Sequence, residues 1–96
     1  MVYFAAGIFE DSRKAGREYE SYIQEVKPIV ERYGGKYLAR SEKLTPLSEK
    51  WRPKRFILIQ WETLEQLQSC FGSEEYQRIA GKRKNSVDSQ GLIVEV

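Results

Sequence analysis

The amino-acid sequence predicts an α+β fold in which strands and helices follow one another in the order β-α-β-β-α-β. Three observations support this prediction. Two regions have the spacing of amphipathic helices, each lies between stretches of strand character, and the two middle strands are separated only by a loop. This order is typical of the ferredoxin-like arrangement, a four-stranded antiparallel sheet with its helices on one face. We expect a single domain over residues 1–96.

Four segments have the composition of strands. They are Val2–Phe9, Lys36–Ser41, Arg55–Trp61 and Gly91–Val96. The third is the strongest, because aromatic and β-branched residues fill most of it. Residues 42–54, which include two prolines and Trp51, are predicted to form the loop between the middle strands.

The first helical region runs from Arg17 to Tyr33. Gly34-Gly35 follows it with residues that tolerate a positive φ and so end a helix. Pro28 lies inside the region, so we expect a kink there or a helix in two pieces. One stripe of the helix is predicted to face the core: Tyr19, Tyr22, Ile23, Val26, Ile29, Val30 and Tyr33.

The second helical region is divided in two. Thr63 and Gln66 have the spacing of a capping box, and the helix that they begin should end at Gly72. Ser73 then caps a further helix, from Glu74 to about Lys84.

The composition excludes several classes of site. The 96 residues include no His and one Cys, which excludes His-based nucleophiles, His-bearing zinc sites and an intrachain disulfide. We expect no metal and no cofactor. A net charge of +2 is too small to indicate nucleic acid or an anionic membrane as the partner. Low cysteine usage suits a reducing compartment, and we expect a cytoplasmic protein. We expect no signal peptide, because strand-like residues follow Met1 at once without a basic segment.

The first and third strands have apolar or small residues on both faces. A sheet with one face in water should alternate to polar residues on that face. Leaving the second face wet would expose an apolar patch of roughly several hundred Å². We therefore expect two copies of the chain to pack sheet to sheet as a homodimer; the alternative is a monomer whose face is covered by a ligand or prone to aggregation.

Three blocks of sequence, together with Tyr19, Tyr22 and Pro28, resemble the domain of unknown function 1330 family of the dimeric α+β barrel superfamily. The blocks are Tyr33-Gly34-Gly35-Lys36-Tyr37-Leu38-Ala39-Arg40, Trp51-Arg52-Pro53-Lys54-Arg55, and Phe71-Gly72-Ser73-Glu74-Glu75-Tyr76 with Arg83 downstream. The resemblance covers nearly the whole chain and implies a ferredoxin-like fold and a homodimer, but no settled activity. The sequence departs from the family pattern at Glu74, where proline is common.

Arg40 and Arg55 are the centre of a candidate ligand site. Arg40 ends one strand and Arg55 begins its antiparallel neighbour, so both should lie at the same end of the sheet. Two guanidiniums there suit a carboxylate or another small anion. Around them we expect an apolar wall from Trp51, hydroxyl contacts from Tyr37 and Tyr76, and backbone N–H groups at the Ser73 helix start.

The alternative interpretation of these residues is structural. Arg40 and Arg55 would then pair with Glu42, Glu49 or Glu75, and Ser73 would only cap its helix. A third interpretation follows from the resemblance, because the superfamily includes metal-free monooxygenase-like and isomerase-like enzymes. Without His, their proton-transfer group would have to be Glu75, Tyr37 or Tyr76.

Two further features are interpreted as structural. The basic cluster Lys82-Arg83-Lys84, with Arg78, is interpreted as a solvated helix end. The cluster does not indicate RNA binding, because the third strand lacks the Gly-containing aromatic signature by which RNA-recognition domains of this strand order bind bases. Cys70 has no feature that would lower its pKa, and we expect an inert thiol.

Overall fold

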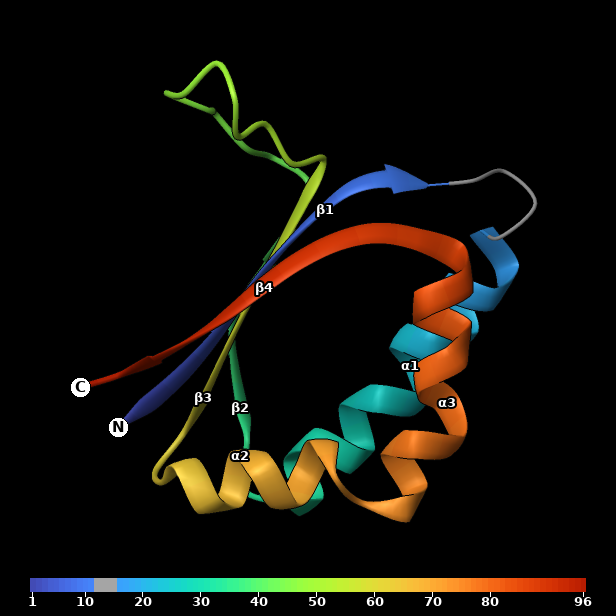
Figure 1. Cartoon of the computed structure of the whole chain (residues 1–96), viewed down its shortest axis with the longest axis vertical. Helices are drawn as coiled ribbons and strands as arrows, with labels where there is room; N and C mark the ends of the chain where they lie inside the picture. The colour runs from blue at the N-terminus through green and yellow to red at the C-terminus, as the bar shows by residue number, and fades with distance from the viewer. Residues whose placement is uncertain (12–15) are drawn as a thin grey trace.

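The computed structural model describes the backbone of residues 1–11 and 16–96, and the side chains of residues 1–9, 21–82 and 88–96. Its elements follow the predicted order, as Figure 1 shows. They are β1 (Val2–Asp11), α1 (Gly16–Arg32), β2 (Lys36–Ser41), β3 (Arg55–Trp61), α2 (Leu64–Phe71), α3 (Glu74–Ser86) and β4 (Val87–Glu95).

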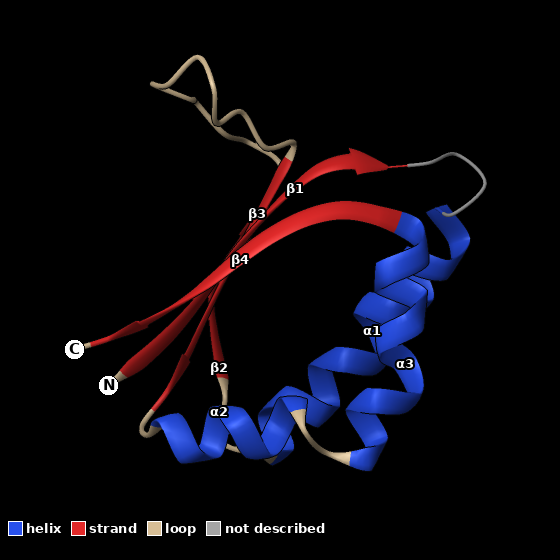
Figure 2. Cartoon of the chain, in the orientation of Figure 1, coloured by secondary structure: helices blue, strands red, loops and turns tan. Residues whose placement is uncertain are grey.

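The four strands form one antiparallel sheet in the order β2-β3-β1-β4. Phe4 of β1 lies opposite Ile59 of β3 on one side and Ile93 of β4 on the other. All three helices lie over the same face of this sheet (Figure 2). The fold is the predicted ferredoxin-like one, with the second helical region divided at Gly72.

The helix ends follow from local chemistry. Thr63 and Gln66 form both bonds of the capping box at the start of α2. Gly34, with a φ of 86°, turns the chain after α1 toward β2. Pro28 lies inside one continuous α1, so the expectation of a helix in two pieces is wrong. The proline side chain is exposed. Packing of the rest of the helix against the core outweighs the one backbone hydrogen bond that proline removes.

Two strands are longer than predicted. β1 continues to Asp11, and β4 begins at Val87, four residues before the predicted start at Gly91. The extra residues pair with each other across the two strands, Asp11 opposite Val87 and Glu10 opposite Asp88. Main-chain hydrogen bonding therefore holds polar residues in a strand whose sequence shows no alternation.

The core lies between the sheet and the helices. The largest fully buried side chains are Trp61, Leu67, Val30 and Cys70. Tyr22 is buried and Tyr33 packs against the core, as the stripe predicted. The side chain of Tyr19 lies outside the described residues.

The opposite face of the sheet carries apolar side chains that nothing in the described part of the chain covers completely. Leu92 is 57% exposed and Val94 is 41% exposed, and they lie opposite Ala5 and Tyr3 of β1. Leu58 of β3 faces the same side, opposite Ala5, and is half-buried. We call the residues Tyr3, Ala5, Leu58, Leu92 and Val94 the outer face.

The packing of Gly35 gives a test of this fold. A Cβ at Gly35 would lie 2.5 Å from Val30 Cγ1 and 2.8 Å from Trp61 Cε2. We expect Gly35→Ala to lower the free energy of unfolding in urea by about 1–3 kcal/mol, because both core neighbours are almost completely buried and the added methyl group overpacks them. Gly81→Ala is the matched control. A Cβ there meets nothing within 4 Å, so this helical change should stabilise the protein by about 0.5–1 kcal/mol. Equal stabilities of the two variants would contradict the described packing.

Candidate functional site

Arg40 and Arg55 line the same surface pocket, which has a volume of about 520 Å³. Arg40 pairs with Ile57 of β3, two residues along from Arg55, so both arginines point to the helix side of the sheet. Ile23 of α1 and the residues that follow β2 complete the pocket: Ser41, Glu42 and Lys43. The convergence that the antiparallel order predicted is present.

The two arginines differ in their partners. Arg55 donates from Nε to Glu42 Oε1 over 3.1 Å and forms a second contact from Nη2. This is one of the structural pairings expected from the sequence. Because the Glu42 side chain is 67% exposed, the pair contributes only about 0–1 kcal/mol. Arg40 instead lies over the ring of Tyr37, 5.5 Å from the centroid. Among the described residues, no carboxylate forms an ion pair with Arg40.

A second, interior cavity of about 40 Å³ lies behind Arg40, between the sheet and the helices. Arg40 and Ile23 line both the surface pocket and this cavity, so they stand where the two meet. The other polar side chains of the lining are Tyr22, Tyr37, Tyr76 and Ser89. The apolar ones are Phe4, Ala6, Ile8, Val26, Val30, Ile57, Ile59 and Phe71.

The hydroxyls of Tyr22 and Tyr76 share a buried hydrogen bond of 3.0 Å that joins α1 to α3. Tyr37 and Tyr76, two residues of the predicted site, both line the cavity. The sequence pattern places Tyr22 in the core alone. Its place on a buried helical stripe gives no sign of the cavity, although a buried tyrosine hydroxyl does require a partner.

Trp51 lies elsewhere. Its ring packs edge to face against Phe9 and Phe56, on the side of the sheet away from the helices. It lines a separate groove, of about 320 Å³, formed mainly by the 42–54 loop. In Figure 1 this loop projects beyond the sheet on that side. Trp51 and Arg40 are therefore not brought together.

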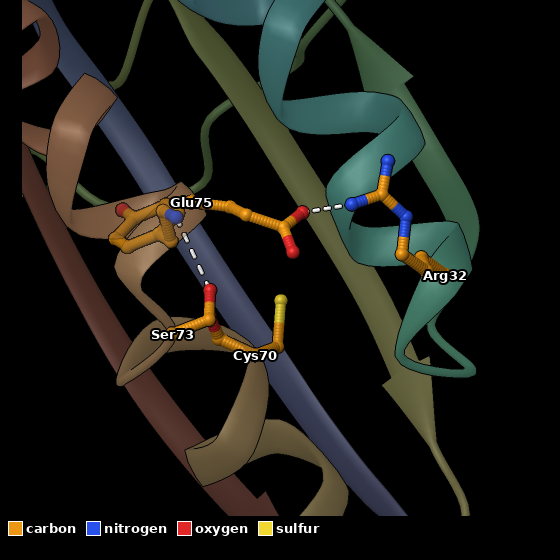
Figure 3. A network of polar contacts seen from close by, with 5 residues as sticks. Arg32, Cys70, Ser73 and Glu75 are labelled. Atoms are coloured by element: carbon orange, nitrogen blue, oxygen red, sulfur yellow. Dashed lines mark hydrogen bonds and ion pairs between the residues drawn. The ribbon is translucent and has the colours of Figure 1, made fainter.

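Ser73 lines neither the pocket nor the cavity, and its hydroxyl is occupied in capping α3. The oxygen accepts a bond from the Tyr76 backbone N–H over 3.1 Å, and the hydroxyl donates to the carbonyl of Cys70 over 2.7 Å. Figure 3 shows this turn. The capping role is the structural alternative that the sequence left open.

Glu75, one candidate for proton transfer, is not among the residues that line the cavity. Figure 3 shows its carboxylate reaching from α3 to Arg32 of α1, with which it forms an ion pair. The described lining of the cavity contains no carboxylate. Of the three candidate groups, only Tyr37 and Tyr76 lie at the cavity.

The described part of the basic cluster is paired. Lys82 Nζ lies 2.9 Å from Glu25 and 3.1 Å from the Ser21 hydroxyl, and Arg78 pairs with Glu74 at 2.9 Å. The side chains of Arg83 and Lys84 lie outside the described residues. Among the described residues, no group of three His, Cys, Asp or Glu is placed to hold a metal ion, and no helix is long and apolar enough to cross a membrane.

Cys70 gives a test of the burial described for α2. Burial, and to a smaller extent the charge of Glu75, raises the pKa of its thiol to about 11. Because the thiolate is the reactive form, we expect a disulfide reagent at pH 8 to label the native protein at least about a hundredfold more slowly than the urea-unfolded chain. Labelling of the native protein should accelerate as the pH approaches 11. Equal rates for native and unfolded chains would contradict the buried position.

Solved structures resemble this chain in fold at low sequence identity. A protein of unknown function from Rhodopseudomonas palustris is 13% identical, with a TM-score of 0.81 over 99% of this chain and 81% of that one. A dimeric ferredoxin-like protein of unknown function from Jannaschia sp. CCS1 is 12% identical, with a TM-score of 0.75 over 99% and 98%. A putative antibiotic biosynthesis monooxygenase from Nitrosomonas europaea is 10% identical, with a TM-score of 0.67 over 100% and 98%.

No curated protein matches the chain in sequence. A family model does match it, over residues 8–96, and its description is domain of unknown function (DUF1330). The resemblance inferred from three sequence blocks is thereby confirmed. The chain belongs to the DUF1330 family.

Proposed function

We propose that this protein binds a small anionic ligand that bears a carboxylate, and that Arg40 holds the carboxylate where the surface pocket meets the interior cavity. One observation supports the proposal: Arg40 lines both spaces, and no described carboxylate pairs with it. A guanidinium in that position offers parallel N–H donors that match the two oxygens of a carboxylate.

The neighbouring residues have supporting roles in this proposal. The Tyr37 ring beneath the guanidinium limits its movement. Arg55 and Lys43 add positive charge to the same pocket, partly offset by Glu42. Tyr76 contributes a hydroxyl at the cavity. Trp51 and Ser73 have no part in it, because they line neither space.

Replacement of Arg40 tests this proposal. We expect Arg40→Ala to weaken binding of a simple carboxylate such as butyrate roughly tenfold to a hundredfold, since a hydrogen bond to a charged group is lost. Arg40→Lys should be intermediate, because it keeps the charge and loses the paired donors. The measurement is an NMR titration at constant ionic strength.

Arg78→Ala is the matched control for charge, since Arg78 lies on α3 and pairs with Glu74. It should leave the affinity unchanged. Equal affinities of the wild type and Arg40→Ala would contradict the proposed role of Arg40.

We further propose that two copies of the chain form a homodimer through the outer face. Leu92 and Val94 are exposed there beside half-buried Tyr3 and Leu58, an apolar surface that a second identical face would cover. The similar protein from Jannaschia sp. CCS1 is described as dimeric, which agrees with this proposal.

Light scattering tests the homodimer. We expect a mass of twice the 11.3 kDa of one chain for the wild type, and a mass near that of one chain for Leu92→Glu. A carboxylate at this position would be buried without a partner in the dimer. Leu92 is exposed on an edge strand, so the variant should retain its fold, as circular dichroism can check.

Gln68→Glu is the control, because it adds the same charge at an exposed position of α2, on the helix side of the sheet. It should remain dimeric. A wild-type protein with the mass of one chain at micromolar concentration would contradict the proposed dimer.

The alternative is a cofactor-independent enzyme of monooxygenase or isomerase type. The fold similarity to a putative antibiotic biosynthesis monooxygenase favours it. Against it, the described lining of the cavity offers tyrosines and no carboxylate for proton transfer. Oxygen uptake with quinol substrates that is lost in Tyr76→Phe would support the enzyme over the binding protein.

A further inference from the structure

The candidate site has two compartments of opposite character, which meet at Arg40 and Ile23. The outer pocket contains charged side chains: Arg40, Arg55, Lys43 and Glu42. The described lining of the inner cavity contains one charged group, Arg40, and is otherwise made of apolar side chains, three tyrosines and Ser89. A ligand that fills both compartments has a charged head and an apolar tail.

The inner cavity selects against a second charge. Its walls include Val26 and Val30 of α1 and Ile57 and Ile59 of β3. An ionised group placed among such side chains without a partner costs several kcal/mol, as a general rule for buried charges. A dicarboxylate therefore gains nothing from this compartment.

The inner cavity also requires no polar group from the ligand's tail. The hydroxyls of Tyr22 and Tyr76 bond to each other at 3.0 Å, so each has a partner before any ligand enters. A plain hydrocarbon tail leaves this bond intact.

The size of the inner cavity limits the length of the tail. Its volume is about 40 Å³. On this measure one water-sized group needs about 10–15 Å³, so the cavity accommodates about three such groups. A tail of about three carbons fits, and a longer chain or an aromatic ring does not fit without displacing packed side chains.

Taken with the proposed function, on which this inference rests, we infer that the ligand is a short aliphatic monocarboxylate with a chain of about four carbons in total. The carboxylate contacts Arg40, and the alkyl tail passes Ile23 into the cavity.

An affinity series tests the inference. The probes are acetate, propionate, butyrate, pentanoate, hexanoate and succinate, titrated into the full chain and followed by NMR. We expect affinity to rise about fourfold for each methylene from acetate to butyrate, in proportion to the apolar area removed from water. Hexanoate should bind no better than butyrate, and succinate should bind at least about tenfold more weakly than butyrate.

Variants of residues that line the inner cavity test whether this cavity causes the dependence of affinity on chain length. Ala6 lines the cavity, and Ala5 next to it points to the outer face. Ala6→Val should reduce the affinity for butyrate to that for acetate and leave the affinity for acetate unchanged. Ala5→Val, the matched control, should change neither affinity. Ile57→Val enlarges the cavity and should move the optimum toward pentanoate, which provides a second reading if Ala6→Val fails to fold.

The outcomes separate the two proposals. Binding that depends on Arg40 but is equal for all monocarboxylates, or a succinate affinity as high as that of butyrate, overturns the inference and leaves the proposed function standing. Affinity that rises with chain length but is unchanged in Arg40→Ala overturns the proposed function. Absence of binding for every probe overturns both.

Discussion

Alternation of side chains along β1 is the constraint on which the rest of the structure depends. Because β1 pairs with both β3 and β4, its register assigns the residues of three strands to one face or the other. Phe4, Ile59 and Ile93 share the helix side, and Ala5, Leu58 and Leu92 share the outer face. A shift of one residue would exchange the two sets and place Leu92 in the core. Core, cavity and outer face all follow from this pairing.

The same register explains why a single residue, Arg40, belongs to two spaces. It lies on the helix side at the end of an edge strand, where Ile23 of α1 approaches and the polar residues after β2 begin. On its core side it lines the cavity together with three tyrosines, and on its solvent side it lines the pocket together with Arg55 and Lys43. A long side chain at such a boundary keeps its charge near water while its stem covers apolar surface.

Part of the candidate site could be predicted from the sequence, and the limit has a physical reason. The sequence predicts that Arg40 and Arg55 lie together, because antiparallel neighbours joined by one loop bring the end of one strand beside the start of the next. Trp51 could not be placed in this way, because it lies within the loop, whose path over the sheet depends on contacts with Phe9 and Phe56. The Tyr22–Tyr76 bond joins two helices, and no local pattern predicts it.

The sequence by itself determined the order of elements, most of their bounds, the capping of α2 and α3 and the apolar character of both sheet faces. These depend on periodicity and on hydrogen bonds between residues close in the chain, such as those of Thr63 and Ser73. The tertiary structure alone decided the early start of β4, the partners of Arg55 and Glu75 and the existence of the cavity. Each of these depends on which distant side chains meet, and long-range packing settles that rather than local preference.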